Sequence, residues 1–139
     1  MAQTVEEIMT TNPRTVKVDD SVRDAARVMN DNDIGDAVVV EDGQVTGIVT
    51  DRDIAVRAVA EGRDAESTTV GEIATTGVHA IEPEASVDDA LRMMREHDIR
   101  RLPVVKNGRP VGIVSLGDLA VEREPDSTLA DISAASPDQ

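Results

Sequence analysis

The sequence predicts a mixed α+β fold made of two copies of one small unit, and three observations support this prediction. When the chain is shifted by 65 residues, residues 5–56 align with residues 70–121 without a gap, and 22 of the 52 aligned positions are identical. Each copy contains an amphipathic helical pattern. Each copy also contains two β-rich runs around a tight-turn signal. We therefore expect two units related by a pseudo-twofold axis, with small sheets packed together and helices flanking them.

Each copy opens with a short helical turn, VEEIM in the first copy and VGEIA in the second, followed by an extended piece at residues 14–18 or 79–81. A longer helix is predicted next, because apolar residues recur there at spacings of three and four. These residues are Val22, Ala25, Ala26 and Met29 in the first copy and Val87, Ala90, Leu91 and Met94 in the second.

Each copy closes with a hairpin and a second helix. The hairpin turns are predicted at residues 42–43 and 107–108, where Asp-Gly and Asn-Gly favour the positive φ angles of a tight turn. The last helix is predicted at DIAVRAVAEG, which ends at Gly62, and at DLAVERE, which ends before Pro125. Each unit is thus expected to run helix, strand, helix, hairpin, helix.

The chain is expected to divide at the polar stretch between the copies. That stretch, GRDAESTT, is poor in apolar residues and is typical of a linker. In the C-terminal tail, Leu129 and Ile132 are expected to dock one capped helical turn ahead of a frayed end. The predicted boundaries are a first unit at residues 1–61, a linker at residues 62–69, a second unit at residues 70–123 and a tail at residues 124–139.

The composition disfavours several classes of partner and chemistry. The formal net charge of −14 repels nucleic acid and anionic membrane surfaces. The absence of cysteine removes thiol nucleophiles, and the absence of aromatic residues leaves aliphatic side chains to hold any planar ligand. No secretion signal or membrane-length apolar run is recognisable, so a cytoplasmic protein is expected. No recognisable motif combines a nucleophile, a base and an orienting group, so we predict no enzymatic activity.

The candidate binding residues lie where the second strand of each hairpin runs into the following helix. A helix start attracts anions, and a carboxylate placed there can accept two hydroxyls of a ribose. A glycine earlier in each strand is expected to allow close backbone approach to whatever sits at the strand end. The residues are Gly47, Thr50 and Asp53 in the first copy and Gly112, Ser115 and Asp118 in the second.

The same spacing has a purely structural alternative. A Ser or Thr three residues before an acid is also a helix-capping signature. Ser21 with Asp24 and Ser86 with Asp89 repeat the spacing at the first helix of each copy, where capping alone is expected. From these residues alone, capping explains the pattern nearly as well as ligand binding does.

These residues resemble the cystathionine-β-synthase-type domain, or CBS domain, whose tandem pair is known as a Bateman module. The resemblance covers residues 5–121 and rests on the ungapped duplication together with three motifs. The motifs are GIVTDRD at residues 47–53, GIVSLGD at residues 112–118 and LPVV at residues 102–105. The chain is also similar to stand-alone two-CBS proteins of the hypoxic-response type, including IRRLP at residues 99–103.

The resemblance implies a regulatory sensor that binds AMP, ADP or ATP in clefts between the two units and carries no covalent cofactor. It implicates Thr50, Asp53, Ser115 and Asp118 in holding ribose and phosphate, and first-strand residues in receiving adenine. It also implies a homodimer that acts on a separate effector protein. The first-strand residues are Thr15, Val16, Ala80 and Ile81.

The repeat alignment predicts that the two clefts are unequal. Two arginines and a proline in the second copy align with a glycine, an aspartate and a valine in the first. Paired arginines favour phosphate, whereas an aspartate repels it. The aligned residues are Arg100, Arg101 and Pro103 in the second copy and Gly35, Asp36 and Val38 in the first.

Two rival functions remain open from the sequence. In one, the same fold is a structural or interaction module without a nucleotide, and the Thr/Asp pairs are only caps. In the other, His79 and His97 join carboxylates in a metal-responsive module, although neither histidine has a histidine equivalent in the other copy.

Overall fold

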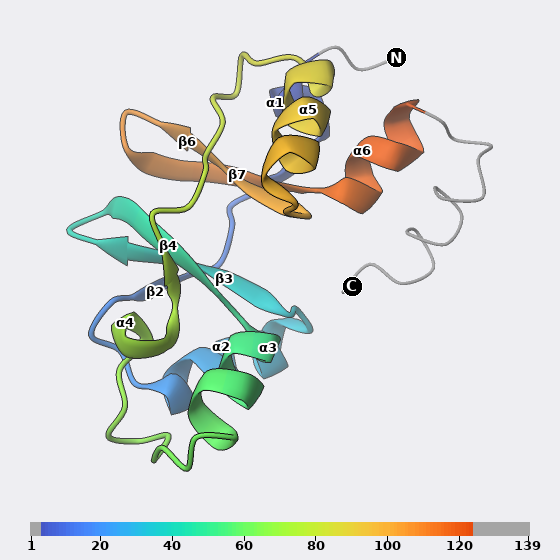
Figure 1. Ribbon diagram of the computed structural model, residues 1–139. Coiled ribbons are helices and arrows are strands. Elements are labelled where there is room, and N and C mark those ends of the chain that lie inside the picture. The colour runs from blue at the N-terminus through green and yellow to red at the C-terminus, as the bar shows by residue number, and fades with distance from the viewer. Residues whose placement is uncertain (1–3, 124–139) are drawn as a thin grey trace. The chain divides into compact units, whose positions relative to one another are not determined.

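The computed structural model describes residues 4–123, whose helices and strands are drawn in Figure 1, most of them with labels. They form two compact units, one comprising residues 4–12 and 79–123 and the other Pro13–Val78. We refer to them as the 79–123 unit and the 13–78 unit. Each combines helices with a small sheet, which confirms the predicted α+β class. The tail predicted at residues 124–139, with its docked turn, lies outside the described residues.

The 13–78 unit contains a sheet with strand order β2-β3-β4-β5, in which β2 and β3 are parallel and the other neighbours are antiparallel. The predicted Asp-Gly hairpin is confirmed, because Asp42 and Gly43 have φ angles of 52° and 80°. Its elements are β2 (Thr15–Lys17), α2 (Val22–Asn32), β3 (Asp36–Glu41), β4 (Gln44–Thr50), α3 (Asp51–Asp53), the π-helix η1 (Ile54–Val59), α4 (Val70–Ile73) and β5 (Thr75–Thr76).

The 79–123 unit contains a sheet with strand order β1-β7-β6, and Ile81 extends it through a parallel bridge to Val104. The predicted Asn-Gly hairpin is also confirmed, with φ angles of 54° at Asn107 and 81° at Gly108. Its elements are α1 (Val5–Ile8), β1 (Thr10–Thr11), α5 (Val87–His97), β6 (Arg101–Lys106), β7 (Arg109–Ser115) and α6 (Leu116–Arg123).

The compact units differ from the sequence repeats, because each repeat's opening helix and strand belong to the other unit. The opening of the first repeat, α1 and β1, joins the 79–123 unit, where Thr10 pairs with Ile113 of β7. The opening of the second repeat, α4 and β5, joins the 13–78 unit, where Thr76 pairs with Gly47 of β4. In both units, the exchanged strand supplies backbone hydrogen-bond partners along one edge of the hairpin.

This exchange explains the glycines in the two motif strands. A Cβ atom on Gly47 would collide with the carbonyl oxygen of Thr75. One on Gly112 would collide with the sulfur of Met9 and lie 2.9 Å from the carbonyl oxygen of Thr10. The expected close backbone approach is therefore present, but it is made by the neighbouring chain segment.

Each unit has its own aliphatic core, and Met29 of α2 and Met94 of α5 fill part of it. The core of the 13–78 unit contains Val16, Val22, Ala25, Met29, Ala37, Val39, Val49, Ala58, Val70, Ile73 and Ala74. The core of the 79–123 unit contains Val5, Ile81, Val87, Ala90, Met94, Leu102, Val104, Val114 and Leu119.

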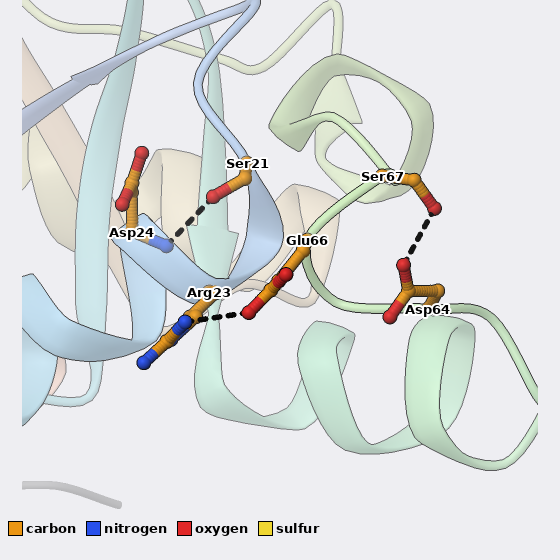
Figure 2. Close-up of polar contacts among 6 residues, drawn as sticks. All are labelled: Ser21, Arg23, Asp24, Asp64, Glu66 and Ser67. Carbon is orange, nitrogen blue, oxygen red and sulfur yellow. Dashed lines mark hydrogen bonds and ion pairs between the residues drawn. The ribbon is translucent and has the colours of Figure 1, made fainter.

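The segment predicted as a linker, residues 62–69, is hydrogen-bonded to the start of α2. The N–H groups of Val22 and Arg23 donate to the carbonyl oxygens of Thr68 and Ala65 at 2.9 and 3.0 Å. Figure 2 shows the Arg23 side chain paired with Glu66 beside the Ser21 cap. These bonds satisfy N–H groups that a helix start leaves without intrahelical partners.

Candidate functional site

In the 13–78 unit, Thr50 and Asp53 form a reciprocal capping box at the end of β4. The hydroxyl of Thr50 accepts a bond from the N–H of Asp53 at 3.1 Å. In return, Oδ2 of Asp53 accepts a bond from the N–H of Thr50 at 3.0 Å. Thr50 keeps extended angles (φ −121°, ψ 164°), so the strand turns into the helix immediately after it.

The 79–123 unit repeats this geometry at the end of β7. The hydroxyl of Ser115 accepts a bond from the N–H of Asp118 at 3.1 Å, and Oδ2 of Asp118 accepts one from the N–H of Ser115 at 3.2 Å. All four side chains of the two boxes belong to half-buried residues. The structural alternative of capping is therefore present at both candidate sites.

The two comparison caps at the long helices are simpler. Ser21 and Ser86 each accept a bond at 3.0 Å from the N–H three residues later, at Asp24 and Asp89. For α2 and α5, only this hydroxyl half of the cap is formed. The return bond from the carboxylate thus distinguishes the two candidate sites from the comparison caps.

Each capping aspartate uses one oxygen in the box, which leaves the other for a further contact. Oδ1 of Asp53 lies 3.8 Å from Nε of Arg57, and that arginine also donates to the carbonyl oxygen of Ile73 at 3.1 Å. For Asp118, the described residues provide no second partner beyond the box. A carboxylate oxygen accepts more than one hydrogen bond, so both sites retain acceptor capacity for a ligand hydroxyl.

The structure brings the predicted arginines to the motif of the 79–123 unit. Arg101 lies directly opposite Ser115 in the β6/β7 register, and the N–H of Leu116 donates to the carbonyl oxygen of Arg100 at 2.7 Å. Pro103 lies further along β6, buried and opposite Ile113. Of these three predicted residues, the two arginines are therefore adjacent to the Ser115 end of the strand.

The first-strand residues predicted to receive adenine divide into two classes. Val16 and Ile81 are only 4% and 6% exposed, and their side chains belong to the cores of their own units. Thr15 and Ala80 are exposed. In the 13–78 unit, Thr15 pairs with Val38, two positions beyond Asp36, the residue opposite Thr50. Because the side chains of Val16 and Ile81 pack in the cores, the side chains that a ligand could contact at these positions are those of Thr15 and Ala80.

The two histidines named in the metal-responsive alternative lie side by side in the 79–123 unit, and the sequence did not predict that they stack. The rings of His79 and His97 stack with centroids 3.5 Å apart and an interplanar angle of 15°. Eighteen positions separate them in the chain, and no periodic pattern links the loop before Ile81 to the last turn of α5. Beside them lies a hollow of about 260 Å³, lined by Ile81, Ala85, Asp89, Arg92, Met93, Glu96 and His97.

Comparison with known families accounts for the duplicated unit. A model of the CBS domain matches residues 5–59 and again residues 70–123. The chain belongs to the CBS-domain family. Members of this family are generally regulatory modules, and the duplicated strand-to-helix motif falls within both matched regions.

Two curated relatives cover most of the chain. The CBS domain-containing protein YhcV of Bacillus subtilis is 44% identical over 119 residues, covering 86% of this chain and 84% of YhcV. Hypoxic response protein 1 of Mycobacterium tuberculosis is 35% identical over 118 residues, covering 84% of this chain and 82% of that protein.

Two solved structures share the fold over nearly their whole length. Hypoxic Response Protein I, crystallised with two coordinated zinc ions, has a TM-score of 0.77 and 35% identity, covering 84% of this chain and 96% of its own. A protein with CBS domains from Burkholderia ambifaria has a TM-score of 0.79 and 36% identity, covering 90% of this chain and 96% of its own.

Within residues 4–123, no three or more His, Cys, Asp or Glu side chains cluster in a way that would hold a metal ion. Over the same described part of the chain, every helix is too short or too polar to cross a bilayer.

Proposed function

We propose that this CBS-domain chain is a regulatory module that binds an adenine nucleotide, AMP, ADP or ATP, at the ends of β4 and β7. This proposal rests mainly on the reciprocal capping boxes at Thr50/Asp53 and Ser115/Asp118. In each box, one carboxylate oxygen of the aspartate accepts a backbone hydrogen bond, and the other oxygen can accept a bond from a ligand hydroxyl. The comparison caps at α2 and α5 lack this arrangement, whereas Thr69 and Glu72 form a similar box at the start of α4, which does not follow the second strand of a hairpin.

The chemistry suits a ribose. Each box fixes its carboxylate on the backbone, so the remaining oxygen is held in place before the ligand arrives, which lowers the entropy cost of binding. The vicinal hydroxyls of a ribose are donors that a carboxylate accepts, and such charge-assisted bonds are stronger than neutral ones. Adenine would be held by backbone groups and aliphatic side chains, since the chain has no aromatic residue.

We also propose that the module acts through association rather than catalysis. In this proposal, two copies of the chain form a homodimer, and a separate effector protein responds to the bound nucleotide. If the ligand binds one conformation or assembly of the module more tightly than another, it increases the population of the form that it binds more tightly.

The test compares the two kinds of cap. Asn in place of Asp53 or Asp118 keeps an oxygen for the box but removes the charge, so we expect nucleotide affinity to fall about tenfold or more, with the fold retained. Asp24→Asn and Asp89→Asn are the matched controls, at the same helix position but without the return bond. Calorimetric titration with AMP, ADP and ATP measures the affinities.

A purely structural module predicts a different result. In that case, no adenine nucleotide would raise the thermal unfolding midpoint, although any ligand selective for the folded state must do so. Equal binding by all four Asn variants would likewise leave capping as the sole role of Asp53 and Asp118.

The metal-responsive alternative is favoured by the two zinc ions of the Hypoxic Response Protein I structure and by the meeting of two histidines here. The stacked rings argue against a shared ion in this arrangement. Histidine binds zinc through a lone pair in the ring plane at about 2.0–2.1 Å, and nearly parallel planes 3.5 Å apart do not converge on one point. Adding zinc to the unfolding assay tests this alternative, which predicts a rise in midpoint that His97→Ala abolishes.

A further inference from the structure

Arg57 of η1 contacts the candidate site and the exchanged helix α4 at the same time. Its Nε atom lies 3.8 Å from Oδ1 of Asp53, the carboxylate oxygen that is not used in the capping box. Its Nη1 group donates a hydrogen bond to the backbone carbonyl oxygen of Ile73 at 3.1 Å. One guanidinium group therefore bridges the motif aspartate and the last residue of α4.

The two contacts of Arg57 have different consequences. At 3.8 Å the guanidinium attracts the carboxylate of Asp53, but the separation is longer than a hydrogen bond, so Oδ1 keeps its lone pairs for a ligand hydroxyl. The side chain of Asp53 is only 13% exposed, which limits the screening of this attraction by solvent. The bond to Ile73 satisfies a carbonyl that the end of a helix leaves without an intrahelical partner, and it orients the guanidinium group.

The segment that Arg57 holds also pairs with the motif strand. Residues 70–76, which comprise α4 and β5, belong to the second sequence repeat but pack in the 13–78 unit. Within this segment, β5 pairs with Gly47 and Ile48 of β4, the strand that runs into the motif. The segment is thus held to the site by strand pairing at β5 and by Arg57 at α4. Movement of α4 away from the unit would break the bond that orients the guanidinium group beside Asp53.

The second repeat has a glutamate at the position of this arginine. Extending the 65-residue alignment by one position places Glu122 opposite Arg57. An ionised carboxylate can neither donate a hydrogen bond to a backbone carbonyl nor attract a second carboxylate. The backbone after the motif differs as well, because a π-helix, η1, contains Arg57 in the 13–78 unit, whereas α6 is an α-helix. π-Helical turns are rare and are frequent at functional sites.

We infer that Arg57 is a positioning residue that couples ligand binding at the first motif to the docking of residues 70–76. A ligand hydroxyl that donates to Oδ1 of Asp53 fixes the carboxylate in the orientation that Arg57 attracts, and the guanidinium group is thereby held on Ile73. Ligand binding then stabilises the docked segment, and by thermodynamic reciprocity the docked segment raises the affinity for the ligand by the same factor. The second motif, with Glu122 in this position, binds without this coupling. The inference rests on the proposed function, because it describes how that site is regulated.

The test isolates the first motif with Asp118→Asn, which weakens the second, and titrates this protein with AMP by calorimetry. Arg57→Met keeps a long unbranched side chain but removes the charge and the donors. It is expected to lower AMP affinity about two- to fivefold, the effect expected of a partly exposed ion pair. Arg57→Lys, which keeps the charge, is expected to restore most of the loss. The control is Arg27→Met, which removes the same charge at an exposed position of α2 and is expected to leave the affinity unchanged.

Hydrogen exchange supplies a measurement that a merely structural role of Arg57 would not change. In the Asp118→Asn protein, saturating AMP is expected to slow the exchange of residues 70–76 about two- to fivefold, the same factor as the affinity effect. When Arg57→Met is added, saturating AMP is expected to leave the exchange of this segment unchanged. Circular dichroism and the unfolding midpoint establish that each variant is folded. If Arg57→Met does not fold, Arg57→Gln, which keeps a donor for Ile73 but not the charge, takes its place.

The outcomes separate this inference from the proposed function. If Arg57→Met binds AMP as its parent does, or if AMP protects residues 70–76 equally in both proteins, the coupling is overturned and the nucleotide function stands. An equal loss of affinity in Arg27→Met would also overturn the coupling, because net charge would then explain the effect. If AMP does not bind to the parent chain, both proposals fall. Loss of affinity and of protection in Arg57→Met, restored by Arg57→Lys, supports both.

Discussion

At the scale of single residues, Gly47 and Gly112 illustrate a sequence signal whose cause lies elsewhere in the chain. We expect Gly47→Ala to destabilise the fold by about 1–3 kcal/mol, because the new methyl group meets a backbone carbonyl that cannot move independently of β5. Gly112→Ala is expected to destabilise the fold too, because the side chain of Met9 can move away but the new methyl group would still lie 2.9 Å from the backbone carbonyl oxygen of Thr10. Chemical denaturation measures both. Gln44→Ala, at an exposed position of β4, is the control.

Glu72, also at the scale of a single residue, makes the stability of the fold depend on pH. The backbone N–H of Thr69 donates to its carboxylate at 2.7 Å and, with the Thr69 hydroxyl and the nearby Arg63, lowers the pKa of Glu72 below its ordinary value of 4.5. A carboxyl whose pKa is lowered by folding stabilises the fold above its unfolded pKa, and this stability is lost as the pH falls through the folded pKa.

We therefore expect Glu72→Gln to flatten the acid side of the stability profile. The glutamine keeps an acceptor for Thr69 but does not titrate, so its unfolding midpoint would decline less steeply than the parent's below about pH 4.5. Thermal unfolding of both proteins from about pH 7 to about pH 3 makes the comparison. Parallel curves would contradict the assigned role of Glu72.

At the scale of elements, the sequence predicted those helices and turns that depend on residues close together in the chain. The apolar spacing from Val22 to Met29 specified α2, and Asp-Gly at residues 42–43 specified its hairpin turn. The exchange of α1 and α4 between units left no such signal. VEEIM and VGEIA are amphipathic in the same way in both repeats, and the unit in which each one packs depends on long-range contacts.

For the candidate site, the sequence predicted the local capping contact but not the features that depend on the folded structure. The spacing of Thr50 and Asp53 predicted a cap, and the structure adds the return bond that distinguishes this cap from Ser21/Asp24. The position of Arg101 opposite Ser115 depends on strand register, which a bulge between Val104 and Val105 shifts. Because a bulge adds a residue to one strand, the pairing of residues across the two strands cannot be predicted from their spacing in the sequence.

The exchange of opening elements makes a prediction about Val5. This residue is fully buried in the core of the 79–123 unit, although it belongs to the first sequence repeat. We expect Val5→Ala to cost about 1–3 kcal/mol through lost packing. Hydrogen exchange would then show reduced protection in β6 and β7, with little change in β3 and β4. Val70→Ala, its equivalent in the other core, is expected to give the opposite pattern. Loss of protection in β3 and β4 on changing Val5 would refute this assignment.

At the scale of the whole molecule, the large negative charge sets a condition on any self-association. With a formal net charge of −14, two copies repel each other at long range, so a stable dimer needs apolar contact to offset that repulsion. The described residues include two large apolar side chains that are exposed, Val56 at 48% and Val59 at 69%, both on η1. Ala55 and Ala60 are exposed as well, and we refer to Ala55, Val56, Val59 and Ala60 together as the apolar strip of η1.

We predict that a second copy of the chain covers this strip and that the homodimer becomes more stable as salt screens the net charge. Sedimentation equilibrium at low and high salt measures the dissociation constant. Val56→Asp combined with Val59→Asp is expected to raise the dissociation constant about a hundredfold or more, because both charges would have to be buried at the interface.

The control is Gln44→Asp combined with Thr11→Asp. This double variant adds the same charge at exposed positions outside the strip and is expected to have a much smaller effect. Equal weakening by the two double variants would show that net charge alone governs association, and a parent chain that stays monomeric at high salt would contradict the dimer outright.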